Sequence, residues 1–314
     1  MAFVRVPGNE VPNGAEEHWL EGRGGVRLRA FTAPALGGPP RGTVILASGR
    51  TEFIEKYFEV IRELQSRGFA VFTMDWRGQG LSGRETSNPM KGHLATFDDP
   101  VNDLATALRL LVGKLPRPYI TLAHSMGGCI VLRALQTRRL EAEAAVFGSP
   151  MWGIQGLRGL AKSYVRFMHS IGAGENFAPG VDKRWKRENF KRNQVTHDKE
   201  RHTRAQDLMT EEPALAIAGP TIGWVNAAID ATEGFLQPSA LAHLRLPVLV
   251  YSAGQEMLVD NKSHDAIVAL LPDAKHLTID GAKHEILQET DDIRAQFWAA
   301  FDPFVDAAAP RRAA

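Results

Sequence analysis

Short apolar runs alternate along this chain with longer stretches in which apolar residues recur every three or four positions. The short runs contain many β-branched and aromatic residues, which is typical of buried strands. The runs expected to be strands are residues 18–21, 26–31, 43–47, 69–74, 119–123, 144–148, 247–252 and 275–279. The helical spacing predicts helices near residues 54–64, 97–111, 126–138, 263–271 and 292–301.

The order of these elements predicts the fold class. Glycines at 22, 24 and 25 separate the first two strands, as in a hairpin. The later strands alternate with helices, which favours an α/β fold with a mostly parallel sheet covered by helices on both faces. In such sheets the carboxyl ends of the strands form the functional edge.

The strand rhythm stops between residues 151 and 237, where charged and aromatic stretches at 185–191, 203–209 and 222–229 resemble helices. We interpret this region as an inserted helical cap. The expected organisation is a core at 1–150, a cap at 151–240, a second part of the core at 241–305 and a disordered, low-complexity tail at 306–314.

Composition limits the possible functions. A chain of 314 residues that is 44% hydrophobic can bury a full core, and a net charge of +1 gives no reason to expect nucleic acid as a partner. The single cysteine, Cys129, permits neither an intrachain disulfide nor a cysteine-rich zinc site, and we expect it to be a small packing residue. No stretch resembles a signal peptide or a membrane span, which predicts a cytoplasmic protein, and we expect no cofactor and no metal.

The first candidate for chemistry is Ser125, within Ala-His-Ser-Met-Gly at positions 123–127. A serine at an ordinary turn would give the same pattern, but this one follows a predicted strand and precedes a predicted helix, as a nucleophile elbow requires. Ala123 and Gly127 are small, so that the sharp turn can close. The amide of Met126, at the start of the helix, could donate to an oxyanion.

A serine hydroxyl needs a base and an acid, which follow it along the chain in this kind of fold. The base is expected to be His284, in the loop after the strand at 275–279. Glu256 and Asp260 both lie in the loop after the strand at 247–252, and we favour Glu256 because Asp260 could simply cap the next helix. The amide of Arg50 is the expected second oxyanion donor, and its side chain could pair with Glu52 or Glu55.

Motifs spread over residues 43–290 resemble those of the lysophospholipase L2 and monoacylglycerol lipase-like serine hydrolases, which have the α/β-hydrolase fold. These motifs are Ser48-Gly-Arg-Thr-Glu52, Lys56-Tyr57, Asp75-Trp-Arg-Gly-Gln-Gly-Leu-Ser-Gly83, Lys91-Gly-His93, Ala123-His-Ser-Met-Gly-Gly128, Gly219-Pro-Thr221 with Trp224, and Val259-Asp-Asn261. The resemblance implies roles for Ser125 and His284, and it supports an acid at Glu256, where many relatives carry aspartate. The glycine loop at 75–83 lacks the spacing and lysine of a phosphate-binding loop, and we expect a structural turn beside the site.

The expected activity is hydrolysis of a carboxylic ester in a lipid-like substrate, either a lysophospholipid or a monoacylglycerol. A general carboxylesterase with the same residues is the alternative, and a non-catalytic binding protein would require a disabled triad.

The cap should choose the substrate. Large apolar side chains there form either an acyl pocket or a small core of the cap itself. The candidates for the pocket are Trp152, Phe167, Trp185 and Trp224, and Met168 and Phe190 are also considered. The basic run at 183–192 is either a solvated helix face or a contact with anionic membrane lipid.

Overall fold

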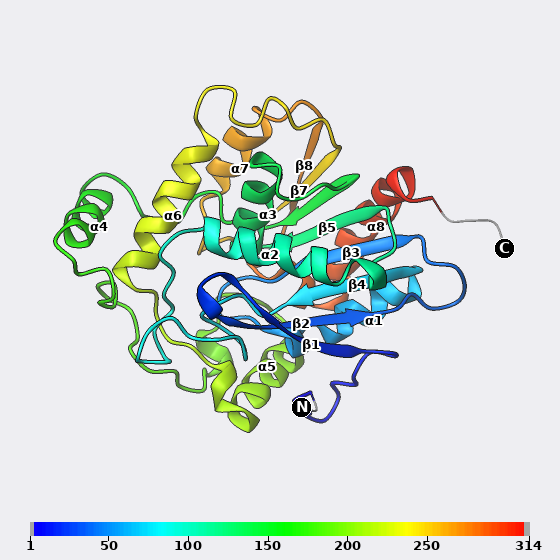
Figure 1. Cartoon of the computed structure of the whole chain (residues 1–314), viewed down its shortest axis with the longest axis horizontal. Helices are drawn as coiled ribbons and strands as arrows, with labels where there is room; N and C mark the ends of the chain where they lie inside the picture. The colour runs from blue at the N-terminus through cyan, green and yellow to red at the C-terminus, as the bar shows by residue number, and fades with distance from the viewer. Residues whose placement is uncertain (1–2, 311–314) are drawn as a thin grey trace.

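An eight-stranded sheet forms the centre of this computed structural model, which describes residues 3–310 (Figure 1). The strands lie in the order β1-β2-β4-β3-β5-β6-β7-β8. The β1–β2 and β2–β4 pairs are antiparallel and all other pairs are parallel. The strands are β1 Glu16–Glu21, β2 Arg27–Ala33, β3 Gly42–Ala47, β4 Phe69–Met74, β5 Tyr119–His124, β6 Ala144–Gly148, β7 Val248–Ala253 and β8 Ala274–Ile279. The predicted α/β class with a mostly parallel sheet is confirmed.

Side chains of the central strands enter two separate cores, one on each face of the sheet. In β3, Ile45 and Ala47 belong to one core and Val44 and Leu46 to the other. The first core is covered by α2 (Asp98–Leu110) and α3 (Met126–Gln136), and the second by α1 (Phe58–Ser66) and α8 (Asp291–Ala308). Figure 1 shows these two pairs of helices on opposite faces of the sheet. Burial on both faces explains why the strands appear in the sequence as continuous apolar runs.

The segment between β6 and β7 carries three α-helices at one end of the sheet (Figure 1). They are α4 (Leu160–Ser170), α5 (Lys199–Glu211) and α6 (Ile222–Phe235). The helices expected at 203–209 and 222–229 lie within α5 and α6. The helix expected at 185–191 is wrong: the backbone is irregular there, apart from a 3₁₀ turn at Phe190–Arg192. This stretch is held by tertiary contacts instead, because Arg187 pairs with Asp207 of α5 at 2.6 Å.

The carboxyl-terminal helix is longer than predicted, because α8 continues to Ala308 instead of ending near residue 301. Val305 and Ala309 are buried in the core, and Arg41 Nε donates to the Ala309 carbonyl at 2.9 Å. The expected disordered tail is therefore wrong for residues 306–309, since these contacts anchor them; residues 311–314 lie outside the described part. None of the helices within residues 3–310 is both long and apolar enough to cross a membrane.

Candidate active site

Ser125 occupies a sharp turn between β5 and α3. Its backbone has φ +50° and ψ −118°, a combination that costs free energy for a residue with a side chain. The Ser125 amide donates to the Gly148 carbonyl at 3.2 Å, and the Ser125 carbonyl accepts from the Met151 amide at 2.9 Å. These bonds to the end of β6 hold the strained turn, so that the Ser125 hydroxyl projects beyond the carboxyl end of β5.

Gly127 is required for this turn to close. A Cβ atom built at Gly127 would lie 2.3 Å from the Ala47 carbonyl oxygen, which belongs to the backbone of β3 and has no flexible side chain to move. The start of α3 thus packs directly on the end of β3, where only glycine fits.

We expect Gly127→Ala to lower the free energy of unfolding by about 1–3 kcal/mol, because the methyl group must push α3 away from β3. Urea unfolding followed by circular dichroism measures this change, and ester hydrolysis should fall with it as Ser125 moves. Gly113→Ala is the matched control: an added Cβ there meets no atom within 4 Å. Equal stability of the two variants would contradict this account of the turn.

His284 lies between Ser125 and Glu256. Its Nε2 is 2.9 Å from the Ser125 hydroxyl oxygen, and its Nδ1 is 2.8 Å from Glu256 Oε2. Ser125 follows the carboxyl end of β5, Glu256 that of β7 and His284 that of β8. The parallel sheet brings these ends to one edge. Ser125 and His284 are both buried, with 8% and 4% of their surface exposed, which protects the hydrogen bonds from competing water.

The carboxylate in contact with His284 belongs to Glu256 and not to Asp260. Glu256 Oε1 accepts from the Leu258 and Val259 amides at 2.8 and 3.2 Å, which fixes the carboxylate while Oε2 faces the imidazole. Burial alone would raise the pKa of Glu256, but the hydrogen bond and charge of His284 and the two amides outweigh it and lower the pKa to about 2. Glu256 is therefore ionised at neutral pH.

Asp260 has the alternative role considered from the sequence. Its side chain accepts from the Lys262 amide at 3.2 Å, at the start of α7 (Asn261–Val268), and it pairs with Arg158 at 2.7 Å. Asp260 is thus a helix cap on the other side of the loop.

Two backbone amides near Ser125, those of Met126 and Arg50, have no hydrogen-bond acceptor among residues 3–310. The Met126 amide is the first of α3 and has no acceptor within the helix. The loop after β3 lies against the serine, since a Cβ built at Gly49 would be 3.1 Å from the Ser125 Cβ. No acceptor for the next amide, that of Arg50, is found within residues 3–310. This arrangement can stabilise negative charge on an oxygen bound between the two amides.

Glu52 holds the loop that carries Arg50. Its buried carboxylate accepts from the Gly49 amide, from the Tyr57 hydroxyl at 2.7 Å and from Lys56 Nζ at 2.9 Å. Burial alone would raise the pKa of Glu52, but the Lys56 ammonium and the Tyr57 hydroxyl help to lower it to about 2. From the other side, Gln79 Nε2 donates to the Gly49 carbonyl at 2.8 Å.

These contacts reveal positioning residues that sequence reasoning did not assign. Tyr57 and Gln79 were visible only as members of the family-like motifs, with no role attached to them. Glu52 was considered only as a partner of the Arg50 side chain. The glycine-rich turn at 75–83 is structural, as expected, and its Gln79 braces the loop beside Ser125.

The expected pairing of Arg50 with Glu52 or Glu55 is wrong. Glu52 is occupied by the loop and Lys56, and Glu55 pairs with Arg29 at 2.5 Å. The Arg50 side chain turns the other way, donates to the Ala218 carbonyl and lies 5.5 Å from the Trp224 ring centre.

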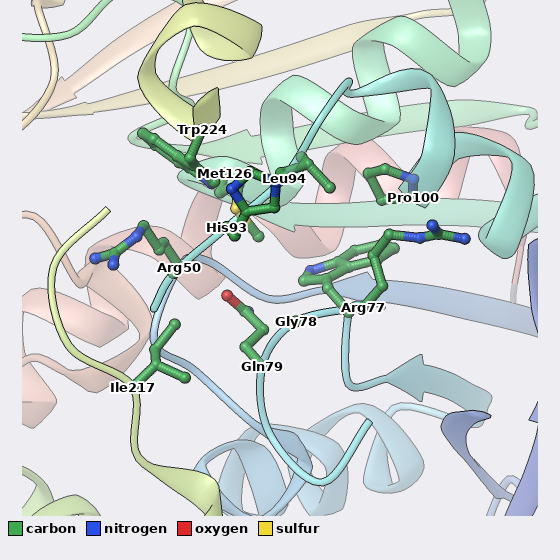
Figure 2. A pocket seen from close by; sticks show the side chains of 12 residues that line it. Arg50, Arg77, Gly78, Gln79, His93, Leu94, Pro100, Met126, Ile217 and Trp224 are labelled. Atoms are coloured by element: carbon green, nitrogen blue, oxygen red, sulfur yellow. The ribbon is translucent and has the colours of Figure 1, made fainter. Parts of the chain in front are cut away.

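The four aromatic residues expected to bind substrate lie in different environments. Trp152 is buried in the core against Phe147, and Phe167 is 60% exposed on α4. Neither residue lines the two cavities that reach Arg50. Trp224 lines a small cavity with Arg50 and Met126 (Figure 2). Trp185 lines a larger groove, described below, that also reaches Arg50.

The fold and the order of serine, acid and histidine along the chain define an α/β hydrolase. The family model described as serine aminopeptidase, S33, matches residues 38–291, and the chain belongs to this family.

Individual relatives agree with this assignment. Lysophospholipase L2 from Escherichia coli strain K12 is 34% identical over 271 residues, covering 80% of this chain and 76% of the relative. Monoacylglycerol lipase from Mycolicibacterium smegmatis is 28% identical over 286 residues, and the match covers 90% of this chain and 94% of the relative. A structure of a soluble variant of monoglyceride lipase from Saccharomyces cerevisiae has the same fold, with a TM-score of 0.76 and 17% identity over 98% of this chain and 99% of the other.

Proposed function

We propose that the protein hydrolyses the carboxylic ester of a lysophospholipid or a monoacylglycerol through an acyl-enzyme on Ser125. The observation that carries this proposal is the chain of hydrogen bonds from Ser125 through His284 to Glu256, beside the amides of Met126 and Arg50. The names of the relatives, a lysophospholipase and a monoacylglycerol lipase, support a lipid ester as the substrate.

In the first step, His284 Nε2 takes the proton of Ser125 as the serine oxygen attacks the ester carbonyl carbon. The Met126 and Arg50 amides stabilise the oxyanion, and the alcohol leaves with the proton from His284. Water then attacks the acyl-enzyme with His284 again as the base, which releases the fatty acid and restores Ser125. Ionised Glu256 stabilises the imidazolium in both steps.

The test is a turnover panel that crosses acyl-chain length with lysophospholipid, monoacylglycerol and simple alkyl ester substrates. We expect kcat/KM to be highest for one of the two lipid classes. A preference for short soluble esters would instead identify a general carboxylesterase, and no turnover of any ester would contradict the proposal. Residues 151–240 act as the cap that chooses among these substrates.

We also propose that the basic run at 183–192 makes a peripheral contact with anionic membrane lipid. The proposed location of the protein is the cytoplasm, where this run would meet the membrane surface. Four exposed cations in this run are available for such a contact, namely Lys183, Arg184, Lys186 and Arg187. Each basic residue near an anionic bilayer contributes about 1 kcal/mol, although the ion pair of Arg187 with Asp207 reduces its share.

Replacing these four residues with glutamine should weaken binding to phosphatidylglycerol-containing vesicles at least about tenfold, as measured by co-sedimentation. The control replaces Arg138 and Arg139, which are exposed at the end of α3, with glutamine. Undiminished vesicle binding by the fourfold variant would rule out the membrane contact.

A further inference from the structure

A groove of about 700 Å³ lies between the loop that carries Arg50 and the inserted segment. Its core side includes Arg50, Lys56 and Glu285, the residue that follows His284. Its other wall is formed by parts of residues 181–195 and of α5, and by residues 217–220. The Glu285 amide donates to the Val195 carbonyl at 2.8 Å, which ties this wall to the His284 loop. The groove therefore borders the proposed catalytic residues.

The side chains that line the groove have an excess of positive charge, although the net charge of the whole chain is only +1. Its cations are Arg50, Lys56, Arg184, Lys186, Arg187 and Arg192, and its anions are Asp182, Glu188 and Glu285. Lys56 is neutralised by Glu52 and Glu285, and Arg187 by Asp207. Within the described part of the chain, no ion pair forms at Arg184, Lys186 or Arg192. The groove thus favours an anionic ligand over a neutral one.

Arg50, at the inner end of the groove, is a partly buried cation without a counter-charge. Its terminal nitrogen Nη2 donates to the Ala218 carbonyl, and its Nε is buried without an acceptor among residues 3–310. No carboxylate in that range forms an ion pair with it. In Figure 2 its side chain extends toward the segment that carries Ile217. Burial lowers the pKa of Arg50 to about 10, so the guanidinium stays charged at neutral pH.

Other buried arginines show how unusual this environment is. Arg29 pairs with Glu17, Glu55 and Asp75, and Arg77 pairs with Asp103 at 2.6 Å. A buried charge without a partner is costly, because the protein does not replace the hydration that the charge has lost. The Ala218 carbonyl and the Trp224 ring offset only part of this cost for Arg50, because neither carries a negative charge. An anionic group of a ligand would supply the missing counter-charge.

We infer that the groove binds the phosphate of a lysophospholipid headgroup and that Arg50 anchors it. In a lysophospholipid the short glycerol backbone joins the phosphate to the ester that is cleaved. With the ester oxygen at the Arg50 amide, the phosphate comes within reach of the Arg50 guanidinium, which matches phosphate oxygens in a two-pronged contact. The inference rests on the proposed function and narrows its substrate: a monoacylglycerol has no phosphate and leaves Arg50 unpaired.

The test compares lysophosphatidylglycerol with a monoacylglycerol of the same short acyl chain, both below their critical micelle concentrations. We expect Arg50→Met to lower the ratio of their kcat/KM values roughly 10- to 100-fold, mainly through KM of the phospholipid. Effects on the shared ester chemistry cancel in this ratio. Arg50→Lys should recover part of it, because the charge is kept.

Two controls separate the site from general electrostatics. Arg109→Met, on the exposed side of α2, removes a charge elsewhere and should leave the ratio unchanged. Lys186→Met, in the groove wall, should lower the ratio severalfold, whereas Lys275→Met, exposed on the edge strand β8 and outside the lining, should not. An unchanged ratio in Arg50→Met overturns the inference.

A binding measurement tests the site without turnover. We expect isothermal titration calorimetry to detect binding of glycerophosphoglycerol, the deacylated headgroup, to the wild type but not to Arg50→Met. Such binding supports the inference even if neither ester is hydrolysed, in which case the proposed function alone fails. No binding, or equal binding of inorganic phosphate and glycerophosphoglycerol, overturns the headgroup assignment.

Discussion

Ser125→Ala lowers kcat for ester hydrolysis by on the order of 10⁶-fold, because the acyl-enzyme can no longer form. The substitution removes one oxygen atom and keeps the Cβ, so that the strained backbone at φ +50° is unchanged. The same variant should lose covalent labelling by a fluorophosphonate, which reacts with the activated serine. Both effects are measured on the purified protein, with a lysophospholipid or monoacylglycerol as substrate and intact-protein mass spectrometry for the label.

Ser149→Ala is the matched control for this variant. Ser149 is also buried at a strand end with positive φ, at +43°, and its hydroxyl has no hydrogen-bond partner among residues 3–310. We expect labelling and turnover to stay within about twofold of the wild type, because this hydroxyl has no base beside it. Labelling that persists in Ser125→Ala, or disappears in Ser149→Ala, would contradict the assignment of the nucleophile.

Glu256→Gln should lower kcat by about 10³- to 10⁴-fold, with little change in KM. The amide has nearly the same shape as the carboxylate but carries no charge, and through its NH₂ group it can hold His284 in the wrong tautomer. The low pKa of Glu256 adds a second expectation. Because this carboxylate ionises near pH 2, its protonation should not contribute to any loss of activity between about pH 5 and 7.

Asp260→Asn distinguishes the two carboxylates of the loop. Asparagine caps a helix about as well as aspartate, so the stability should change by less than about 1 kcal/mol and kcat by only a fewfold. The loss of the ion pair with Arg158 has little effect, because Arg158 is 63% exposed at its side chain. A larger loss of kcat in Asp260→Asn than in Glu256→Gln would reverse the assignment of the acid.

The sequence alone predicted the sheet, Ser125 and His284, because each depends on local patterns and chain order. Strands buried on both faces appear as apolar runs, and parallel strands bring their carboxyl ends to one edge. A serine and a histidine at two such ends are expected to meet, as their 2.9 Å contact shows. The need for a small residue at position 127 was also predictable from the sequence, because it depends only on the local geometry of the turn after Ser125.

The choice between Glu256 and Asp260 required the tertiary structure. Both residues lie in one loop within four positions of each other, and the backbone path decides which carboxylate faces the imidazole. The amides of Leu258 and Val259 turn Glu256 toward His284, while Asp260 is directed to the start of α7. A one-dimensional pattern contains no information on such directions.

Contacts between distant parts of the chain decided the remaining features. The charged stretch at 185–191 is held by α5 instead of forming a helix, and α8 extends because Arg41 and the core anchor its end. The Arg50 side chain has two nearby acidic residues in sequence but bonds to the carbonyl of Ala218, 168 positions away. The sequence determined which groups were available for chemistry at this edge of the sheet. Only the packing of remote segments decided which of the charges there were neutralised and which have no ion pair among residues 3–310.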